Sequence, residues 1–146
     1  MFKPSVAQSE KYTVIMHQLL DKSVTNPLDY QFIHVYNFVT KHYIIFKRSI
    51  TTNYILAYTE SMNQFALLHI ADRQENDHFT VEEKVIFSRN DIVSFKKNLF
   101  GKHVLKLNDG SEYRFYVQPY IPAVPGTFTL PVLQEEKVGF FLQAIK

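Results

Sequence analysis

The chain has 146 residues, of which 46% are hydrophobic, 15% aromatic and 21% charged, and its formal net charge is +2. This length and composition predict one globular domain over residues 1–146 and exclude a disordered chain. The chain contains no cysteine, which excludes disulfides, thiolate nucleophiles and Cys-ligated zinc.

The first predicted element is a helix over residues 5–22. Ser5 followed by Gln8 has the spacing of a capping box at its start. Apolar residues then recur at helical spacing, at Tyr12, Ile15, Met16, Leu19 and Leu20. Asn26-Pro27 ends any helix, because the residue before a proline avoids the α region.

Residues 30–117 predict a series of antiparallel strands, because they form short runs rich in aromatic and β-branched residues. The runs cover residues 30–39, 42–47, 54–59, 64–71, 81–87, 92–95, 104–107 and 112–117. Asn108-Asp109-Gly110 joins the last two runs as a hairpin, with glycine where the backbone needs a positive φ. In the first run Phe32 and Tyr36 share one face and Ile33 and Val35 the other. We therefore expect cover on both sides, one of them by the N-terminal helix.

The last part of the chain predicts an extended segment followed by a helix. Residues 118–131 carry prolines at positions 119, 122, 125 and 131, which favour extended or polyproline-like backbone. The predicted C-terminal helix covers residues 133–146, with an apolar stripe of Val138, Phe141, Leu142 and Ile145. Gly139 inside this helix costs about 1 kcal/mol relative to alanine, so we expect it to mark close packing against a strand.

The late strands carry a pattern of apolar spacing, in residues 85–95 (VIFSRNDIVSF) and 103–115 (HVLKLNDGSEYRF). With this pattern, residues 30–146 resemble bacterial pleckstrin-homology-like (PH-like) domains. The resemblance implies a mainly β (α+β) fold, a PH-like β-sandwich or partly open barrel of about seven antiparallel strands with a C-terminal helix. The N-terminal helix and the proline-rich segment would be additions to that pattern.

A basic loop between two predicted strands is the first candidate binding site. It contains Lys96, Lys97, Leu99, Phe100, Lys102 and His103. Lysines attract an anionic membrane or an acidic partner, and exposed apolar residues between them insert into it. The alternative is a solvated hairpin whose Leu99 and Phe100 fold back onto the core.

The proline-rich segment is a second candidate, as an interaction arm formed by Pro119, Tyr120, Ile121, Pro122 and Pro125. Prolines at every third residue share one face of a polyproline II turn, which suits docking on a partner or on a second copy of the chain. The alternative is that the segment wraps its own domain, because its apolar residues would otherwise form a sticky patch.

The sequence lacks the local motifs of most enzyme classes. No phosphate-binding glycine loop, nucleophile elbow, HExxH zinc pair or EF-hand loop occurs. The six histidines are not spaced as ligand pairs, although His34, His42 and His69 would approach one another if their strands were neighbours. The adjacent carboxylates Glu82-Glu83 and Glu135-Glu136 do not face each other across a cleft. We therefore expect no catalytic residue, no metal and no cofactor.

The favoured function is a non-enzymatic binding or interaction module of PH-like type, acting through the basic loop or through a sheet edge that a peptide extends. Its expected partner is another protein or a second copy of the chain, with a peripheral anionic membrane surface as a further option. Dispersed basic residues disfavour nucleic acid. The alternative function is a cup for a small apolar ligand, with or without enzymatic activity, lined by Tyr36, Phe38, Tyr58 and His69. Without a signal-like or membrane-spanning apolar run, the sequence predicts a cytoplasmic protein.

Overall fold

The computed structural model describes residues 3–42, 47–71, 79–122 and 130–146, and for residues 39–42 and 47–50 it describes the backbone alone. Within these residues the elements are, in chain order, α1 (Val6–Ser23), the 3-10 turn η1 (Pro27–Asp29), β1 (Tyr30–His42), β2 (Lys47–Thr59), β3 (Gln64–Ile70), β4 (Val81–Ser88), the 3-10 turn η2 (Arg89–Asp91), β5 (Ile92–Lys97), β6 (His103–Leu107), β7 (Glu112–Phe115), β8 (Tyr120–Ile121), β9 (Val132–Leu133) and α2 (Glu135–Ala144).

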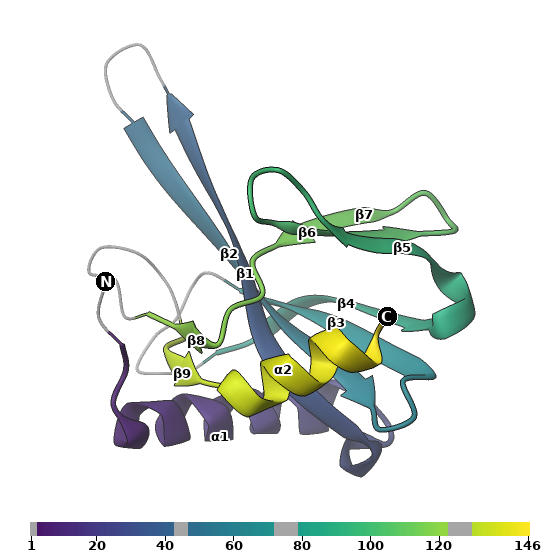
Figure 1. Cartoon of the computed structure of the whole chain (residues 1–146). Helices are drawn as coiled ribbons and strands as arrows, with labels where there is room; N and C mark the ends of the chain where they lie inside the picture. The colour runs from purple at the N-terminus through teal and green to yellow at the C-terminus, as the bar shows by residue number, and fades with distance from the viewer. Residues whose placement is uncertain (1–2, 43–46, 72–78, 123–129) are drawn as a thin grey trace.

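The strands form three antiparallel sheets (Figure 1). Strands β1 to β4 make a four-stranded meander, β5 to β7 make a three-stranded meander, and β8 pairs with β9. A bridge between Tyr36 and Tyr116 connects the edge of β1 to the chain just after β7. Among the described residues β4 and β5 do not pair, so the two larger sheets do not close into a barrel. The predicted mainly β, α+β class is confirmed.

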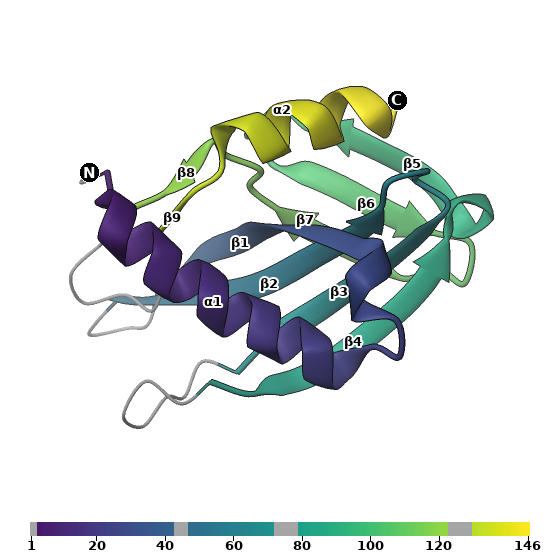
Figure 2. The same cartoon turned by 90° about the horizontal axis from the view of Figure 1, so that it is seen from below.

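Both faces of the four-stranded sheet are buried, as the apolar pattern of its first strand predicts. On one face, Met16 and Leu20 of α1 pack in a core cluster with Phe32 of β1. Figure 2 shows α1 running across this sheet. On the other face, Leu56 of β2 packs in a second cluster with residues of β5 to β7 and with Phe141 of α2. Each fully buried side chain of this size contributes roughly 1.5–3 kcal/mol.

Local signals place the ends and turns of these elements. Ser5 caps α1 by accepting a hydrogen bond from the Gln8 amide at 3.1 Å, as the capping pattern predicts. Gly110 has φ +92° in the β6–β7 turn, which confirms the predicted hairpin. The β2–β3 turn uses Met62 at φ 60°, a backbone conformation that is uncommon outside glycine. Because the Met62 side chain is buried in the second core cluster, its packing offsets this strain.

The strands predicted over residues 30–39 and 54–59 are present, but both are longer than predicted: β1 and β2 pair from Tyr30↔Thr59 to His42↔Lys47. The prediction of a separate strand that includes residues 42 and 47 is wrong, because these two residues end β1 and begin β2. Residues 43–46 of the predicted 42–47 run lie outside the described residues. The error arose at residues 47–53, where polar residues weaken the apolar signal while threonine and isoleucine still favour extended backbone.

The expectation for Gly139 is also wrong. A Cβ added at Gly139 would meet no atom of the described part of the chain within 4 Å, and the residue is exposed. The glycine therefore does not allow a close approach to a strand. The apolar stripe of the helix is confirmed, since Val138 and Phe141 are buried in the second cluster and Leu142 and Ile145 pack against it.

The side-chain amide of Gln134 joins the segment before α2 to the edge of β1. The Gln134 side chain accepts a hydrogen bond from the His34 amide at 2.8 Å and donates one to the His34 carbonyl, also at 2.8 Å. It donates a second hydrogen bond to the Gln118 carbonyl at 3.0 Å. A single buried side chain thus takes the place of a neighbouring strand at this position, and it satisfies backbone groups that no water reaches.

Candidate functional site

The loop between β5 and β6 is a tight turn held by one side chain. Asn98 Oδ1 accepts hydrogen bonds from the backbone amides of Phe100 at 2.9 Å and Lys102 at 3.0 Å. The Asn98 amide donates to the Lys102 carbonyl, and Gly101 completes the turn at φ +83°. Asparagine side chains favour such turns because they replace a backbone acceptor. The turn is therefore fixed by its own hydrogen bonds and does not rely on packing of its tip.

The tip of this turn presents two apolar side chains to the solvent. Leu99 is 101% exposed and Phe100 is 82% exposed. The alternative in which these residues fold back onto the core is therefore not what this structure contains. Exposed apolar residues gathered at one protruding element mark interaction sites more often than isolated ones do.

Lysines surround the tip, but they are placed differently. Lys96 and Lys97 are exposed on the β5 arm of the hairpin. Lys102 turns toward β1, where its Nζ donates to the Phe38 carbonyl at 3.3 Å and lies 5.5 Å from the centre of the Tyr116 ring. Lys102 thus links the base of the loop to β1, and Lys96 and Lys97 remain for a partner.

The His103 side chain packs against an aromatic neighbour on β5. Its ring stacks on Phe95 with centroids 5.0 Å apart. Its Nδ1 atom is buried and has no hydrogen-bond partner among the residues that the structure describes. Burial, and then the nearby charge of Lys97, lower the pKa of His103 below its usual value, which favours the neutral ring.

The outer face of the β5–β7 sheet adds basic residues that sequence reasoning missed. Register places Lys96 and Arg114 on either side of Val104, in a hollow of about 290 Å³ that Lys106 also lines. Arg114 forms a salt bridge of 3.0 Å with Glu112, and Glu112 is the single acidic side chain among the described residues that line this hollow. Alternation along β6 and β7 was the signal that could have assigned Lys106 and Arg114 to the same face as Lys96.

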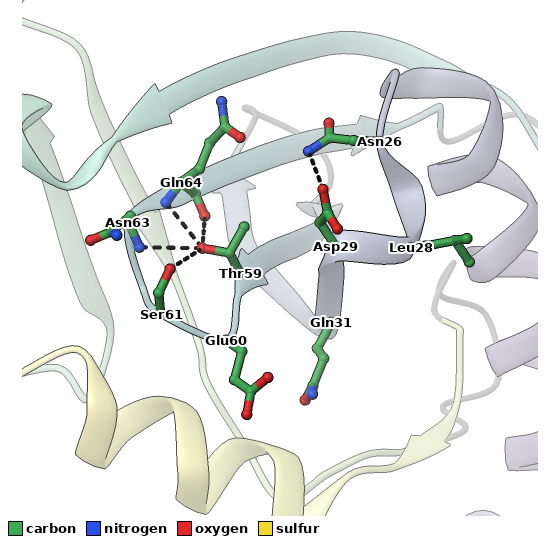
Figure 3. Close-up of a pocket in the computed structure, with 9 residues that line it drawn as sticks. All are labelled: Asn26, Leu28, Asp29, Gln31, Thr59, Glu60, Ser61, Asn63 and Gln64. Carbon is green, nitrogen blue, oxygen red and sulfur yellow. Dashed lines mark hydrogen bonds between the residues drawn. The ribbon is translucent and has the colours of Figure 1, made fainter.

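A larger hollow, of about 720 Å³, lies where β1 begins and β2 ends (Figure 3). Its centre is Thr59, whose hydroxyl accepts hydrogen bonds from the amides of Asn63 and Gln64 at 3.2 Å each. Asn26 bonds Asp29 at 3.1 Å on the other wall. Because these groups serve the β2–β3 turn and η1, the hollow is explained by local structure and we assign it no ligand.

The described part of the proposed interaction arm packs within the chain. Ile121 and Pro122 are buried, Tyr120 is half-buried and Pro119 is exposed. Pro125 lies outside the described residues. In this structure the arm therefore offers Pro119 and part of Tyr120 to a partner, and its role in interaction stays a prediction.

The histidines expected to approach one another are not brought together where their side chains are described. The His34 ring is fully buried, with Nδ1 2.9 Å from the Leu130 carbonyl and Nε2 2.8 Å from Asn53 Oδ1. His69 lies two strands away, 3.6 Å from a Glu82 oxygen. The His42 side chain lies outside the described side chains. Across the described residues no group of three or more potential metal ligands occurs.

His34 has a pKa of about 4, lowered from 6.5 by burial, although both of its hydrogen bonds act in the opposite direction. A neutral ring carries one N–H, which it donates either to the Leu130 carbonyl or to Asn53 Oδ1. His34 is therefore a neutral structural residue at pH 7.

The residues of the alternative ligand cup are dispersed. Tyr36 packs against the cluster under α1, whereas Tyr58 belongs to the cluster on the opposite face of the sheet. His69 stacks on Tyr54, and Phe38 is 38% exposed. The four side chains therefore do not line one pocket.

Comparison of the chain with protein-family models, with curated proteins and with solved structures finds no match. In the part of the chain that the structure describes, neither helix combines the length and apolar character needed to cross a bilayer. The functional argument consequently rests on the geometry of the site.

Proposed function

We propose that the chain is a non-enzymatic binding module of PH-like type that docks on an anionic membrane surface through its β5–β6 hairpin. The observation that carries the proposal is the Asn98 turn, which fixes Leu99 and Phe100 in exposed positions next to two exposed lysines. The PH-like assignment is supported by the order of elements, a four-stranded and then a three-stranded meander followed by a C-terminal helix.

The shape of the hairpin favours a membrane over a protein surface. A stable protein interface buries about 800 Å² on each partner, which two side chains on a narrow turn do not supply. Insertion into a bilayer needs only the tip, because the lipid adapts to it. Lys96 and Lys97 then lie at the level of the headgroups, where anionic lipid attracts them.

The expected affinity is modest. Burial of Leu99 and Phe100 contributes roughly 1.5–3 kcal/mol each, and Lys96 and Lys97 about 1 kcal/mol each near an anionic leaflet. The total of about 5–8 kcal/mol corresponds to reversible binding in the micromolar to submillimolar range. Binding should weaken as salt is added, because the lysine contribution is screened.

Cosedimentation with vesicles tests this proposal. We expect binding to phosphatidylcholine vesicles that contain phosphatidylglycerol, and loss of binding in Leu99→Ser/Phe100→Ser and in Lys96→Glu/Lys97→Glu. The control is Leu28→Ser/Lys22→Glu, which makes one change of each kind, at a 92% exposed leucine and at an exposed lysine outside the hairpin. Absence of binding by the unmodified chain, or equal loss in the control, contradicts membrane docking through this hairpin.

A further inference from the structure

The second half of β1 and the first half of β2 form a two-stranded ribbon that projects from the rest of the chain (Figure 1). Among the described residues β3 pairs with β2 only as far as Asn53, so residues 37–42 and 47–52 pair as strands only with each other. At about 3.3 Å per residue, this ribbon is about 20 Å long. We infer that the ribbon enters the major groove of double-stranded DNA, while the outer face of the β5–β7 sheet binds phosphates beside that groove.

The ribbon belongs to a stretch of sequence that has cationic residues and no acidic one. Residues 30–59 contain Lys41, Lys47 and Arg48 but no aspartate or glutamate. All three cationic residues occupy the last two pairs of the ribbon, Lys41↔Arg48 and His42↔Lys47. The backbone register therefore gathers three cationic residues at the far end of the ribbon, and no carboxylate on either strand offsets their charge.

The β5–β7 sheet adds a second basic surface. Residues 92–107 contain four lysines and, like residues 30–59, no aspartate or glutamate. On the outer face of this sheet Lys96, Lys106 and Arg114 are exposed and line the hollow of about 290 Å³. This hollow is a place where a phosphate of a DNA backbone meets several cationic side chains at once.

Lys102 joins the two basic surfaces. Its Nζ donates to the Phe38 carbonyl at the base of the ribbon, although these residues are 64 positions apart in the sequence. Together, residues 30–59 and 92–107 contain three and four, thus seven, of the 16 lysines and arginines of the chain and none of its 14 aspartates and glutamates. The fold thus brings together basic residues that are dispersed along the sequence, and clustered charge of this kind is the electrostatic footprint of nucleic-acid binding.

The shape of the ribbon favours duplex DNA over other nucleic acids. The major groove of B-DNA is about 12 Å wide and admits a two-stranded β-ribbon. The major groove of an RNA duplex is deep and too narrow for side chains to read. Single strands are bound largely by bases that stack on aromatic rings, and no aromatic ring is among the described residues that line the hollow on the sheet.

Fluorescence anisotropy of the full chain with a labelled DNA duplex of about 20 base pairs, two helical turns, tests the inference. We expect binding that weakens with salt, because each phosphate contact releases counterions and adds about 0.9 to the slope of log K against log salt. The variants Lys41→Ala/Arg48→Ala and Lys106→Ala/Arg114→Ala should each bind at least roughly tenfold more weakly and lower that slope by about 2. Because they change separate elements, the test remains valid if one variant fails to fold.

The control variant Lys22→Ala/Lys146→Ala removes the same charge at exposed positions outside both surfaces and should bind normally. A duplex methylated at guanine N7, an atom of the major groove, should bind more weakly than the untreated duplex. Absence of duplex binding, equal affinity for the methylated duplex, equal affinity for an RNA duplex of the same sequence, tighter binding to a single strand, or equal loss in the control overturns the inference.

Vesicle binding separates this inference from the proposed function. Lys41→Ala/Arg48→Ala leaves the β5–β6 hairpin unchanged, so this variant should still bind vesicles that contain phosphatidylglycerol. If it loses vesicle binding and keeps its affinity for duplex DNA, the ribbon binds the membrane and the inference is wrong. Conversely, Leu99→Ser/Phe100→Ser should lose vesicle binding and keep its affinity for duplex DNA, because it retains every cationic residue.

Discussion

Replacing Gln134 by alanine should destabilise the fold strongly, because this one side chain satisfies several buried backbone groups. The side-chain amide of Gln134 forms hydrogen bonds with both the backbone N–H and the backbone C=O of His34, and it also donates to the Gln118 carbonyl. Gln134 is 6% exposed and His34 is fully buried, so water does not replace these partners. Each buried backbone group left without a partner costs about 1–3 kcal/mol.

The loss of both His34 partners therefore lowers the free energy of unfolding by roughly 2–6 kcal/mol, out of about 5–15 kcal/mol for a domain. Urea unfolding followed by circular dichroism measures it. A loss of about 3 kcal/mol moves the midpoint by about 1.5 M when the slope is near 2 kcal/mol per M. Gln143→Ala, an exposed glutamine on the same helix, should stay within about 0.5 kcal/mol. A Gln134→Ala variant as stable as Gln143→Ala would refute the role assigned to this amide.

Three further predictions concern stability. Gly139→Ala should raise the free energy of unfolding by about 0.5–1 kcal/mol, because the added methyl group meets nothing and helix propensity improves; a lower thermal midpoint would contradict this. Arg89→Ala should lower the free energy of unfolding by about 1–3 kcal/mol, because the carbonyls at the end of α2 lose two charge-assisted hydrogen bonds. Denaturant unfolding of Arg89→Ala and Arg89→Lys, compared with the unmodified chain, measures the effect. Between pH 6.5 and about 4 the unfolded chain protonates His34 while the native chain does not, so stability should fall by up to roughly 3 kcal/mol as the pH drops through that window. In His34→Gln this part of the pH dependence should disappear, and its persistence would place its origin elsewhere.

Local patterns predicted those parts of the fold that depend on local physics. The Ser5 cap, the Gly110 turn and the apolar stripe of α2 each follow from backbone or periodicity rules that act over a few residues. The cover on both faces of β1 also followed from its pattern, because a strand with two apolar faces requires two packing partners.

Features that depend on residues far apart in sequence could not be predicted in this way. Gln134 and His34 are 100 residues apart, and nothing local indicates that a side-chain amide will replace a strand. The contact between Phe95 of β5 and Phe141 of α2 likewise joins distant parts of the sequence, and Arg89 holds the end of α2 in this arrangement. The prediction that Gly139 packs closely against a strand was wrong because helix propensity alone does not reveal whether a glycine has neighbours.

The hairpin site was predicted in composition but not in geometry. The sequence placed Leu99 and Phe100 between lysines, yet it left open whether they were exposed or folded onto the core. The deciding residue is Asn98, whose side chain holds the turn through two backbone amides. Asn98 followed by Gly101 was a detectable turn signal, because these two residue types favour the conformations that such a turn needs.

Fluorescence of a Phe100→Trp variant tests membrane docking most directly. The chain contains no tryptophan, so the new residue is the only indole reporter and stands at the tip of the hairpin. On vesicles containing phosphatidylglycerol, its emission should move to shorter wavelength and should be quenched by lipids brominated in their acyl chains. An emission that stays at its solvent-exposed wavelength on these vesicles would contradict the proposed function.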